Sequence, residues 1–79
     1  MRILFFAHLK EVTKCDFVEL DLQSTLDAAG LWVQLVKQFP GLAAHRASVR
    51  LAKNGEYAVA EPEFSNDDEV ALIPPVSGG

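Results

Sequence analysis

The pattern of apolar and polar residues changes several times along the chain and predicts its elements in order. Residues 2–7 form a continuous apolar run rich in strand formers, which is typical of a strand buried on both faces or nearly so. Residues 8–14 interrupt this pattern. Residues 16–22 then alternate, with every second residue from Val18 onward apolar, which predicts a half-exposed strand in a hairpin with the first.

One amphipathic helix is predicted in the middle of the chain. Ser24-Thr25 is the expected N-cap, and Asp27 would place a carboxylate at the positive end of the helix dipole. Trp32 is expected in the core or at its edge, and Pro40-Gly41 ends the helix because the residue before a proline avoids the helical region. The apolar residues at helical spacing are Leu26, Ala29, Val33, Val36 and Phe39.

The second half of the chain predicts three more strands. Residues 48–52 and 57–60 flank an Asn54-Gly55 pair, a strong hairpin signal because both residues tolerate positive φ. Residues 65–68 form a polar turn, and an apolar strand runs from residue 69 to residue 74.

This order of two strands, a helix and three strands predicts an α+β fold. The simplest packing pairs the apolar first and last strands in the centre of one mixed sheet, with the helix across one face. That arrangement is a β-grasp, and a generic split α+β sheet is the alternative. We expect a domain over residues 1–73 and an extended tail over residues 74–79.

One helix covers one face of a sheet, so the other face should keep an apolar patch. If Ile3 and Phe5 point toward the helix, Leu4 and Phe6 point away from it. By the same alternation Ile73 joins Phe6 on the outer face, beside the start of the tail. Such a patch predicts a partner-binding surface; the alternative is that loop residues 8–14 or 42–47 cover it.

Composition and charge narrow the class of protein. The 79 residues suit one domain, and 49% of them are apolar, enough for a packed core. A net charge of −4 with scattered basic residues argues against nucleic acid as a partner. No apolar run is long enough for a membrane span, and the start of the chain lacks a signal-peptide cleavage site, so we expect a cytoplasmic protein without membrane contact.

Few side chains offer chemistry of their own. Cys15 is the single cysteine and cannot form an internal disulfide; we interpret it as a thiol without function. His8 and His45 are far apart in the sequence and no metal-ligand spacing surrounds them, so no metal site is expected. Asp67 and Asp68 are interpreted as part of a solvated turn, because the glycine and glutamate of a calcium loop are missing.

The last six residues carry the most specific chemistry. Pro74-Pro75 stops strand pairing, and the tail can extend roughly 20 Å. The Gly78-Gly79 end has no side chains, so it can thread a narrow tunnel into another protein. The carboxylate of Gly79 is then the predicted working group, although as a poor electrophile it needs activation. A frayed terminus without function is the alternative.

Four segments resemble the small subunits of molybdopterin synthase, the ubiquitin-like β-grasp sulfur carriers of molybdenum cofactor biosynthesis. They read FFAHLKEV, TLDAAGLWVQLVKQFPGL, KNGEYA and DDEVALIPPVSGG, and the resemblance covers essentially the whole chain. The sequence departs from the family pattern at Lys10, where arginine is common, at Lys14-Cys15, where glycine is more usual, and at Lys53, where an apolar residue is common.

The resemblance implies a defined use of Gly79. Its carboxylate would be adenylated by a ubiquitin-activating-like adenylyltransferase using ATP and magnesium. Sulfur from a donor such as a cysteine desulfurase or rhodanese would then form a thiocarboxylate. In the heterotetrameric synthase, the large subunit would receive the tail, and two deliveries to cyclic pyranopterin monophosphate would build the molybdopterin dithiolene.

The resemblance also implies roles for other residues. Phe6 and Ile73 match apolar positions at the partner interface. The chain would bind no cofactor itself and have no autonomous catalysis. The residues that would enter the partners are Pro74, Pro75, Val76, Ser77 and Gly78.

Three other functions remain open from the sequence. A thiamine-pathway sulfur carrier would share the fold and the tail chemistry. A ubiquitin-like modifier would join Gly79 to lysines through isopeptide bonds. A plain binding module would have an inert tail.

Overall fold

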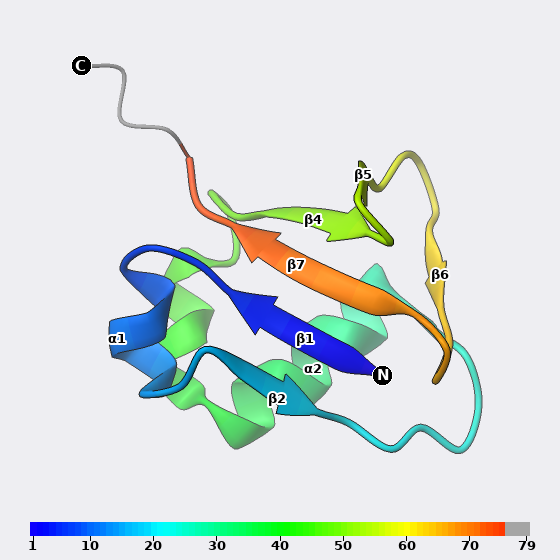
Figure 1. Ribbon diagram of the computed structural model, residues 1–79, viewed down its shortest axis with the longest axis horizontal. Coiled ribbons are helices and arrows are strands. Elements are labelled where there is room, and N and C mark those ends of the chain that lie inside the picture. Colours follow the sequence, from blue (N-terminus) through cyan, green and yellow to red (C-terminus); the bar gives the residue numbers. More distant parts are fainter. Residues whose placement is uncertain (76–79) are drawn as a thin grey trace.

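A five-stranded mixed sheet forms the centre of the computed structural model, which describes residues 1–75 (Figure 1). Its strand order is β2-β1-β7-β4-β5. The first and last strands, β1 and β7, pair in parallel, and all the other pairs are antiparallel. The strands are β1 (Arg2–Phe5), β2 (Phe17–Glu19), β4 (Arg50–Lys53), β5 (Glu56–Tyr57) and β7 (Glu69–Ile73). The predicted β-grasp is confirmed.

One main helix, α2 (Ala28–Gln38), crosses one face of this sheet, and the 3₁₀ helix η1 (Pro40–His45) follows it. A two-stranded sheet pairs β3 (Leu26–Asp27) with β6 (Glu63–Phe64) at the margin of the domain.

A second short helix, α1 (Leu9–Thr13), occupies the segment in which no element was predicted. The Thr13 hydroxyl lies 3.1 Å from the Leu9 carbonyl oxygen and 3.0 Å from the Cys15 carbonyl oxygen. It therefore donates a hydrogen bond to backbone carbonyl groups of the helix and of the residues just after it. Lys14 then takes a left-handed conformation, with φ of 65°. This conformation explains why glycine suits the position, because only glycine adopts it without a steric cost.

The predicted N-cap of the main helix is wrong. Asp27 is the N-cap, and its side chain accepts a hydrogen bond of 2.7 Å from the Gly30 backbone N–H. Ser24-Thr25 lies too early, because residues 26 and 27 first pair with β6 before the helix begins.

The predicted buried face of the helix is also wrong in part. Leu31, Trp32 and Leu35 are its buried residues, whereas Val33 is 61% exposed. The helix carries apolar residues around more than one side, so two series fit the helical period equally well. Packing against the sheet selects the series with the bulkier side chains.

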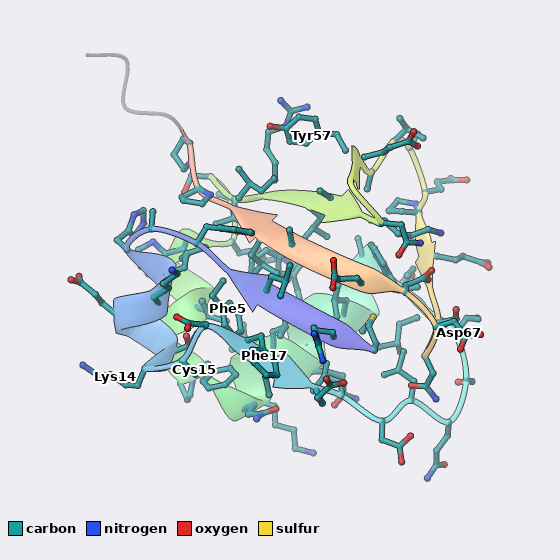
Figure 2. The ribbon with its side chains drawn as sticks, in the orientation of Figure 1. Phe5, Lys14, Cys15, Phe17, Tyr57 and Asp67 are labelled. Atoms are coloured by element: carbon teal, nitrogen blue, oxygen red, sulfur yellow. The ribbon has the colours of Figure 1, made fainter. Side chains whose placement is uncertain are left out.

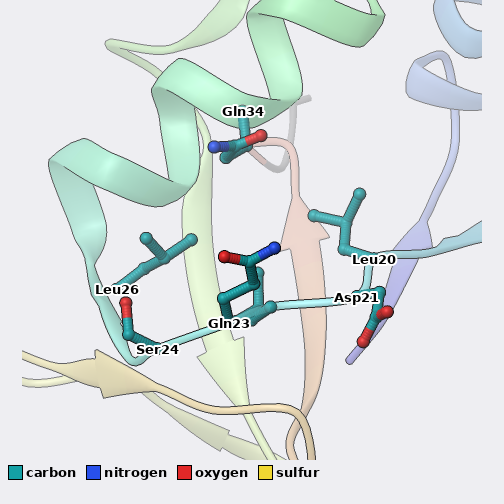
Figure 3. A pocket seen from close by; sticks show the side chains of 7 residues that line it. Leu20, Asp21, Gln23, Ser24, Leu26 and Gln34 are labelled. Carbon is teal, nitrogen blue, oxygen red and sulfur yellow. The ribbon is translucent and has the colours of Figure 1, made fainter.

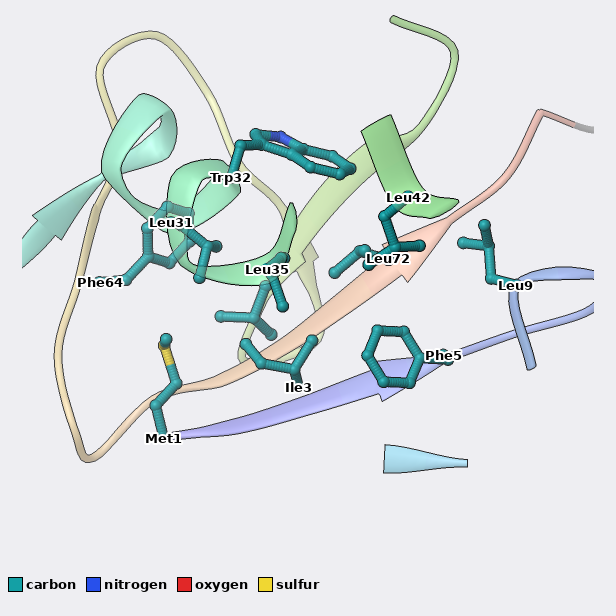
Figure 4. Packing of buried hydrophobic residues seen from close by; sticks show 11 residues of the cluster. Met1, Ile3, Phe5, Leu9, Leu31, Trp32, Leu35, Leu42, Phe64 and Leu72 are labelled. Carbon is teal, nitrogen blue, oxygen red and sulfur yellow. The ribbon is translucent and has the colours of Figure 1, made fainter. Parts of the chain in front are cut away.

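The core lies between α2 and the inner face of the sheet (Figure 4). Phe5 is 1% exposed, and its ring meets that of Phe39 edge to face with centroids 5.5 Å apart. The inner-face residues of β1 and β7 are buried as predicted. The buried apolar residues of this cluster are Met1, Ile3, Phe5, Leu9, Leu31, Trp32, Leu35, Leu42, Phe64, Val70 and Leu72.

The predicted hairpin is confirmed, with positive φ at Asn54 (52°) and Gly55 (87°). The Asn54 side-chain oxygen also accepts a hydrogen bond of 2.9 Å from the Glu69 backbone N–H, which ties the turn to the start of β7. The strand after the turn is shorter than expected, because β5 ends at Tyr57 and residues 58–62 form a loop.

Candidate partner-binding face and tail

The outer face of the sheet carries a row of residues that crosses all five strands. Leu4 lies opposite Phe17 on one side and Ala71 on the other, and Ala52 lies between Ala71 and Tyr57. We call the outer-face residues Leu4, Phe6, Phe17, Tyr57 and Ile73 the apolar strip.

Aromatic rings dominate the exposed part of the apolar strip. Phe6 is 44% exposed, Phe17 is 46% exposed and Tyr57 is 53% exposed, while Leu4 and Ile73 are half-buried. Figure 2 shows Phe17 and Tyr57 at opposite sides of the sheet. Large exposed rings on one face are typical of a surface that a partner covers. The exposed fraction of Phe6 confirms its predicted outward direction.

The segments that offered an alternative cover for the patch lie on the other side. Leu9 and Leu42 are fully buried in the core beneath α2, so the segments around them pack on the helix side of the sheet. They leave Phe6 exposed. Cover by residues 8–14 or 42–47, the alternative to a partner surface, therefore does not hide Phe6, which remains 44% exposed.

Two arginines frame the apolar strip. Arg2 lies over the Phe17 ring at 4.8 Å from its centroid, and Arg50 lies over the Tyr57 ring at 4.3 Å. Arg2 also pairs with Glu19 at 3.0 Å, with both side chains largely exposed. The face therefore combines apolar rings with two arginines, of which Arg2 is paired with a glutamate.

The tail begins at the edge of this face. Because β1 and β7 are parallel, their carboxyl ends meet at the same edge of the sheet, where Phe6 follows one strand and Pro74 the other. Pro74 is half-buried and Pro75 is exposed, and neither belongs to a strand. The predictions for Val76, Ser77, Gly78 and Gly79 lie outside the described residues.

The hollow shown in Figure 3 has a volume of about 330 Å³ and lies between α2 and the segment after β2. Its lining contains no cysteine, histidine, lysine or arginine side chain; it consists of Leu20, Asp21, Leu22, Gln23, Ser24, Leu26 and Gln34. Within residues 1–75 every buried side-chain polar atom has a hydrogen-bond partner. Asp21 and Ser24 are the residues of this lining with a carboxylate or a hydroxyl, and no histidine of the lining accompanies them.

The acidic turn has a structural role in addition to the solvated turn that was expected. The carboxylate of Asp68 accepts hydrogen bonds from the Ser65 backbone N–H (2.8 Å) and the Asn54 side-chain amide (2.9 Å). These bonds, chiefly that from Ser65, hold the pKa of Asp68 below its ordinary value, and the nearby charge of Lys53 adds to the effect.

The two histidines lie side by side, contrary to their separation in the sequence. The ring centroids of His8 and His45 are 5.2 Å apart. Of the two reasons given for expecting no metal site, the distance between the histidines is therefore wrong. Residues 1–75 contain no group of three or more His, Cys, Asp or Glu side chains placed to hold a metal ion. Cys15 is a free, half-buried thiol.

No helix in the described part of the chain is long and apolar enough to cross a membrane.

The fold defines a ubiquitin-like β-grasp protein whose sheet exposes an apolar strip on its outer face. Comparison with known families is more specific: the model of the ThiS family matches residues 3–79. The chain belongs to the ThiS family.

Curated relatives match over the whole chain. The molybdopterin synthase sulfur carrier subunit of Arabidopsis thaliana is 35% identical, and the match covers 100% of this chain and 82% of the relative. The protein of the same name from Mycobacterium tuberculosis is 33% identical, with 100% and 96% covered. The resemblance inferred from the sequence motifs is thereby confirmed.

Solved structures support the same fold. The crystal structure of SAMP1, a small archaeal modifier protein, from Haloferax volcanii superposes with a TM-score of 0.84 at 31% identity, covering 100% of this chain and 98% of that one. Subunits 1 and 2 of the molybdopterin-converting factor of Helicobacter pylori form a complex whose matching chain gives a TM-score of 0.64 at 20% identity, with 99% and 96% covered. At that identity the match shows the fold alone.

Proposed function

We propose that this protein is a sulfur carrier of molybdenum cofactor biosynthesis and acts as the small subunit of molybdopterin synthase in the cytoplasm. One observation on the structure carries the proposal: the exposed apolar strip adjoins the sheet edge at which β7 leads into the tail. A partner that covers the strip would thus hold the tail at a fixed distance from its own active site. The full-length match to named sulfur carrier subunits supports the same role.

The chemistry proposed for Gly79 proceeds in three displacements. The terminal carboxylate attacks the α-phosphate of ATP on a ubiquitin-activating-like adenylyltransferase, and pyrophosphate leaves with magnesium assisting. The outer sulfur of a persulfide on a cysteine desulfurase or rhodanese then displaces AMP and forms an acyl disulfide with Gly79. A second thiol, acting as the reductant, cleaves the S–S bond, which frees the thiocarboxylate and leaves a disulfide between the donor cysteine and that thiol.

The second partner is the large subunit of the synthase. It would bind the apolar strip and receive the tail residues Pro74, Pro75, Val76, Ser77 and Gly78. Its catalytic groups would transfer sulfur from the thiocarboxylate to cyclic pyranopterin monophosphate. The complex of Helicobacter pylori subunits 1 and 2 is a precedent for such a pair on this fold.

Intact mass spectrometry tests the proposal. The purified chain is incubated with ATP, magnesium, a candidate adenylyltransferase and a sulfide source, and one terminal oxygen is expected to be replaced by sulfur. Adding the large subunit and the pterin precursor should then remove that sulfur. Sulfur that is gained but never passed to the precursor would instead indicate the thiamine or another pathway.

Protein modification is the second candidate function, favoured by the high structural similarity to the archaeal modifier protein. In that case Gly79 would form isopeptide bonds with lysines of other proteins. Lysine-linked conjugates that accumulate in cells and disappear when Gly79 is deleted would support it. Their absence, together with sulfur transfer in the assay above, would leave the carrier role.

A further inference from the structure

The fold brings together the chain's two histidines. His8 directly precedes α1, and His45 is the last residue of η1. Their ring centroids are 5.2 Å apart and the ring planes are inclined at 52°. Neither the apolar strip nor the tail chemistry uses these side chains.

The spacing of the two rings fits shared coordination of one metal ion. Zinc binds a histidine nitrogen at about 2.0–2.1 Å and prefers a tetrahedral angle between its ligands. That geometry places the centroids of two coordinating imidazoles roughly 5 Å apart. The inclination between the planes is also favourable, because it allows one nitrogen of each ring to face a common point, which parallel stacked rings do not.

The backbone of both histidines is held in place. The His8 carbonyl oxygen accepts hydrogen bonds from the backbone N–H groups of Glu11 and Val12. The His45 carbonyl oxygen accepts from those of Ser48 and Val49. The two rings are thus carried by ordered segments, which lowers the entropy cost of joining them through a metal.

The surroundings leave room for solvent ligands. His8 is exposed and His45 is half-buried. Nearby in the sequence are Glu11, which favours a cation, and Arg46, which opposes one. The other nearby cation, Lys10, has its Nζ 3.7 Å from the Asp16 carboxylate and is thus paired with a negative charge. Because no third protein ligand is placed for coordination within residues 1–75, the remaining positions would be taken by water.

We propose that His8 and His45 form an open two-histidine site for a divalent transition metal, with Zn²⁺ the best fit to the ring spacing. Imidazole is a preferred ligand of zinc, copper, iron and nickel, whereas magnesium and calcium prefer oxygen ligands, so the ligand set favours the former group. The bound metal would link α1 to η1 close to Phe6, at the end of β1.

The test is a titration of the tag-free chain with Zn²⁺ alone, followed by calorimetry and by NMR of the histidine ring protons. We expect one zinc per chain, with both ring signals shifting together. His8→Ala and His45→Ala should each weaken binding by at least about tenfold, because each removes the chelate. Cys15→Ser is the matched control and should bind zinc as the unmodified chain does.

Three results would overturn the proposal: no ring shift at millimolar Zn²⁺, binding that survives loss of either histidine, or binding that Cys15→Ser abolishes. Circular dichroism and melting of the two histidine variants without metal would establish that they remain folded. If one of them unfolds, the conservative His8→Gln or His45→Gln variant replaces it, with the same expectation.

Discussion

Two neighbouring phenylalanines show how far single side chains can differ in role on this sheet. Phe5 is buried in the core beneath α2, and Phe6 is 44% exposed beside the tail. The two are adjacent in sequence, and the alternation of a strand alone places them on opposite faces.

We expect Phe5→Ala and Phe6→Ala to separate stability from partner binding. Phe5→Ala should lower the free energy of unfolding by about 3–5 kcal/mol, because it leaves a cavity in the core. Phe6→Ala should cost about 1 kcal/mol or less, but should weaken binding of the large subunit. Urea unfolding and calorimetric titration measure the two effects. Equal losses of stability would mean that Phe6 is a core residue.

Asp68 makes the stability of the acidic turn depend on pH. Its pKa is lowered in the folded state, so the folded chain holds the proton less tightly than the unfolded chain. The stabilisation is therefore present above the ordinary aspartate pKa of about 4 and is lost as pH falls through the lower folded value.

The Asp68→Asn variant should show a shallower fall in stability below about pH 4 than the unmodified chain. Urea midpoints measured between pH 2 and pH 7 test this, with the exposed Asp67→Asn as the matched control. An unchanged acid slope in Asp68→Asn would contradict the assigned hydrogen bonds.

Among the elements, α1 is one that sequence periodicity failed to predict, as are η1, β3 and β6. It spans only Leu9–Thr13, too short for a helical period to emerge, and its buried residues Leu9 and Thr13 are four apart. Its left-handed end at Lys14 also lacks the glycine that would have marked a helix terminus.

Lys14→Gly should stabilise the protein by about 0.5–1 kcal/mol. Glycine removes the cost of the left-handed conformation, which for other residues is about 1–2 kcal/mol, and gives back part of the gain as chain entropy in the unfolded state. Thermal unfolding measures the change. Lys14→Ala, which keeps the steric cost, is the control and should show no such gain; destabilisation by glycine would refute the explanation.

At the scale of the whole molecule, the sheet and the tail are expected to have separable roles. The tail is expected to contribute little to the core, so deleting Gly79 should abolish sulfur transfer and leave the melting temperature nearly unchanged. Addition of one alanine after Gly79 should have the same effect, because it moves the carboxylate away from its proposed position. A matching fall in melting temperature would contradict this view of the tail.

Sequence alone determined the β-grasp order, the central pairing of the terminal strands, the outward position of Phe6 and the terminal chemistry proposed for Gly79. These properties depend on short-range alternation, turn residues and an unusual terminus, all of which are readable locally. The tertiary structure decided which side of α2 is buried, because two apolar series compete and only packing against the sheet distinguishes them. It also brought Phe17 and Tyr57 into one strip and His8 against His45, since contacts between distant segments depend on strand register and helix docking.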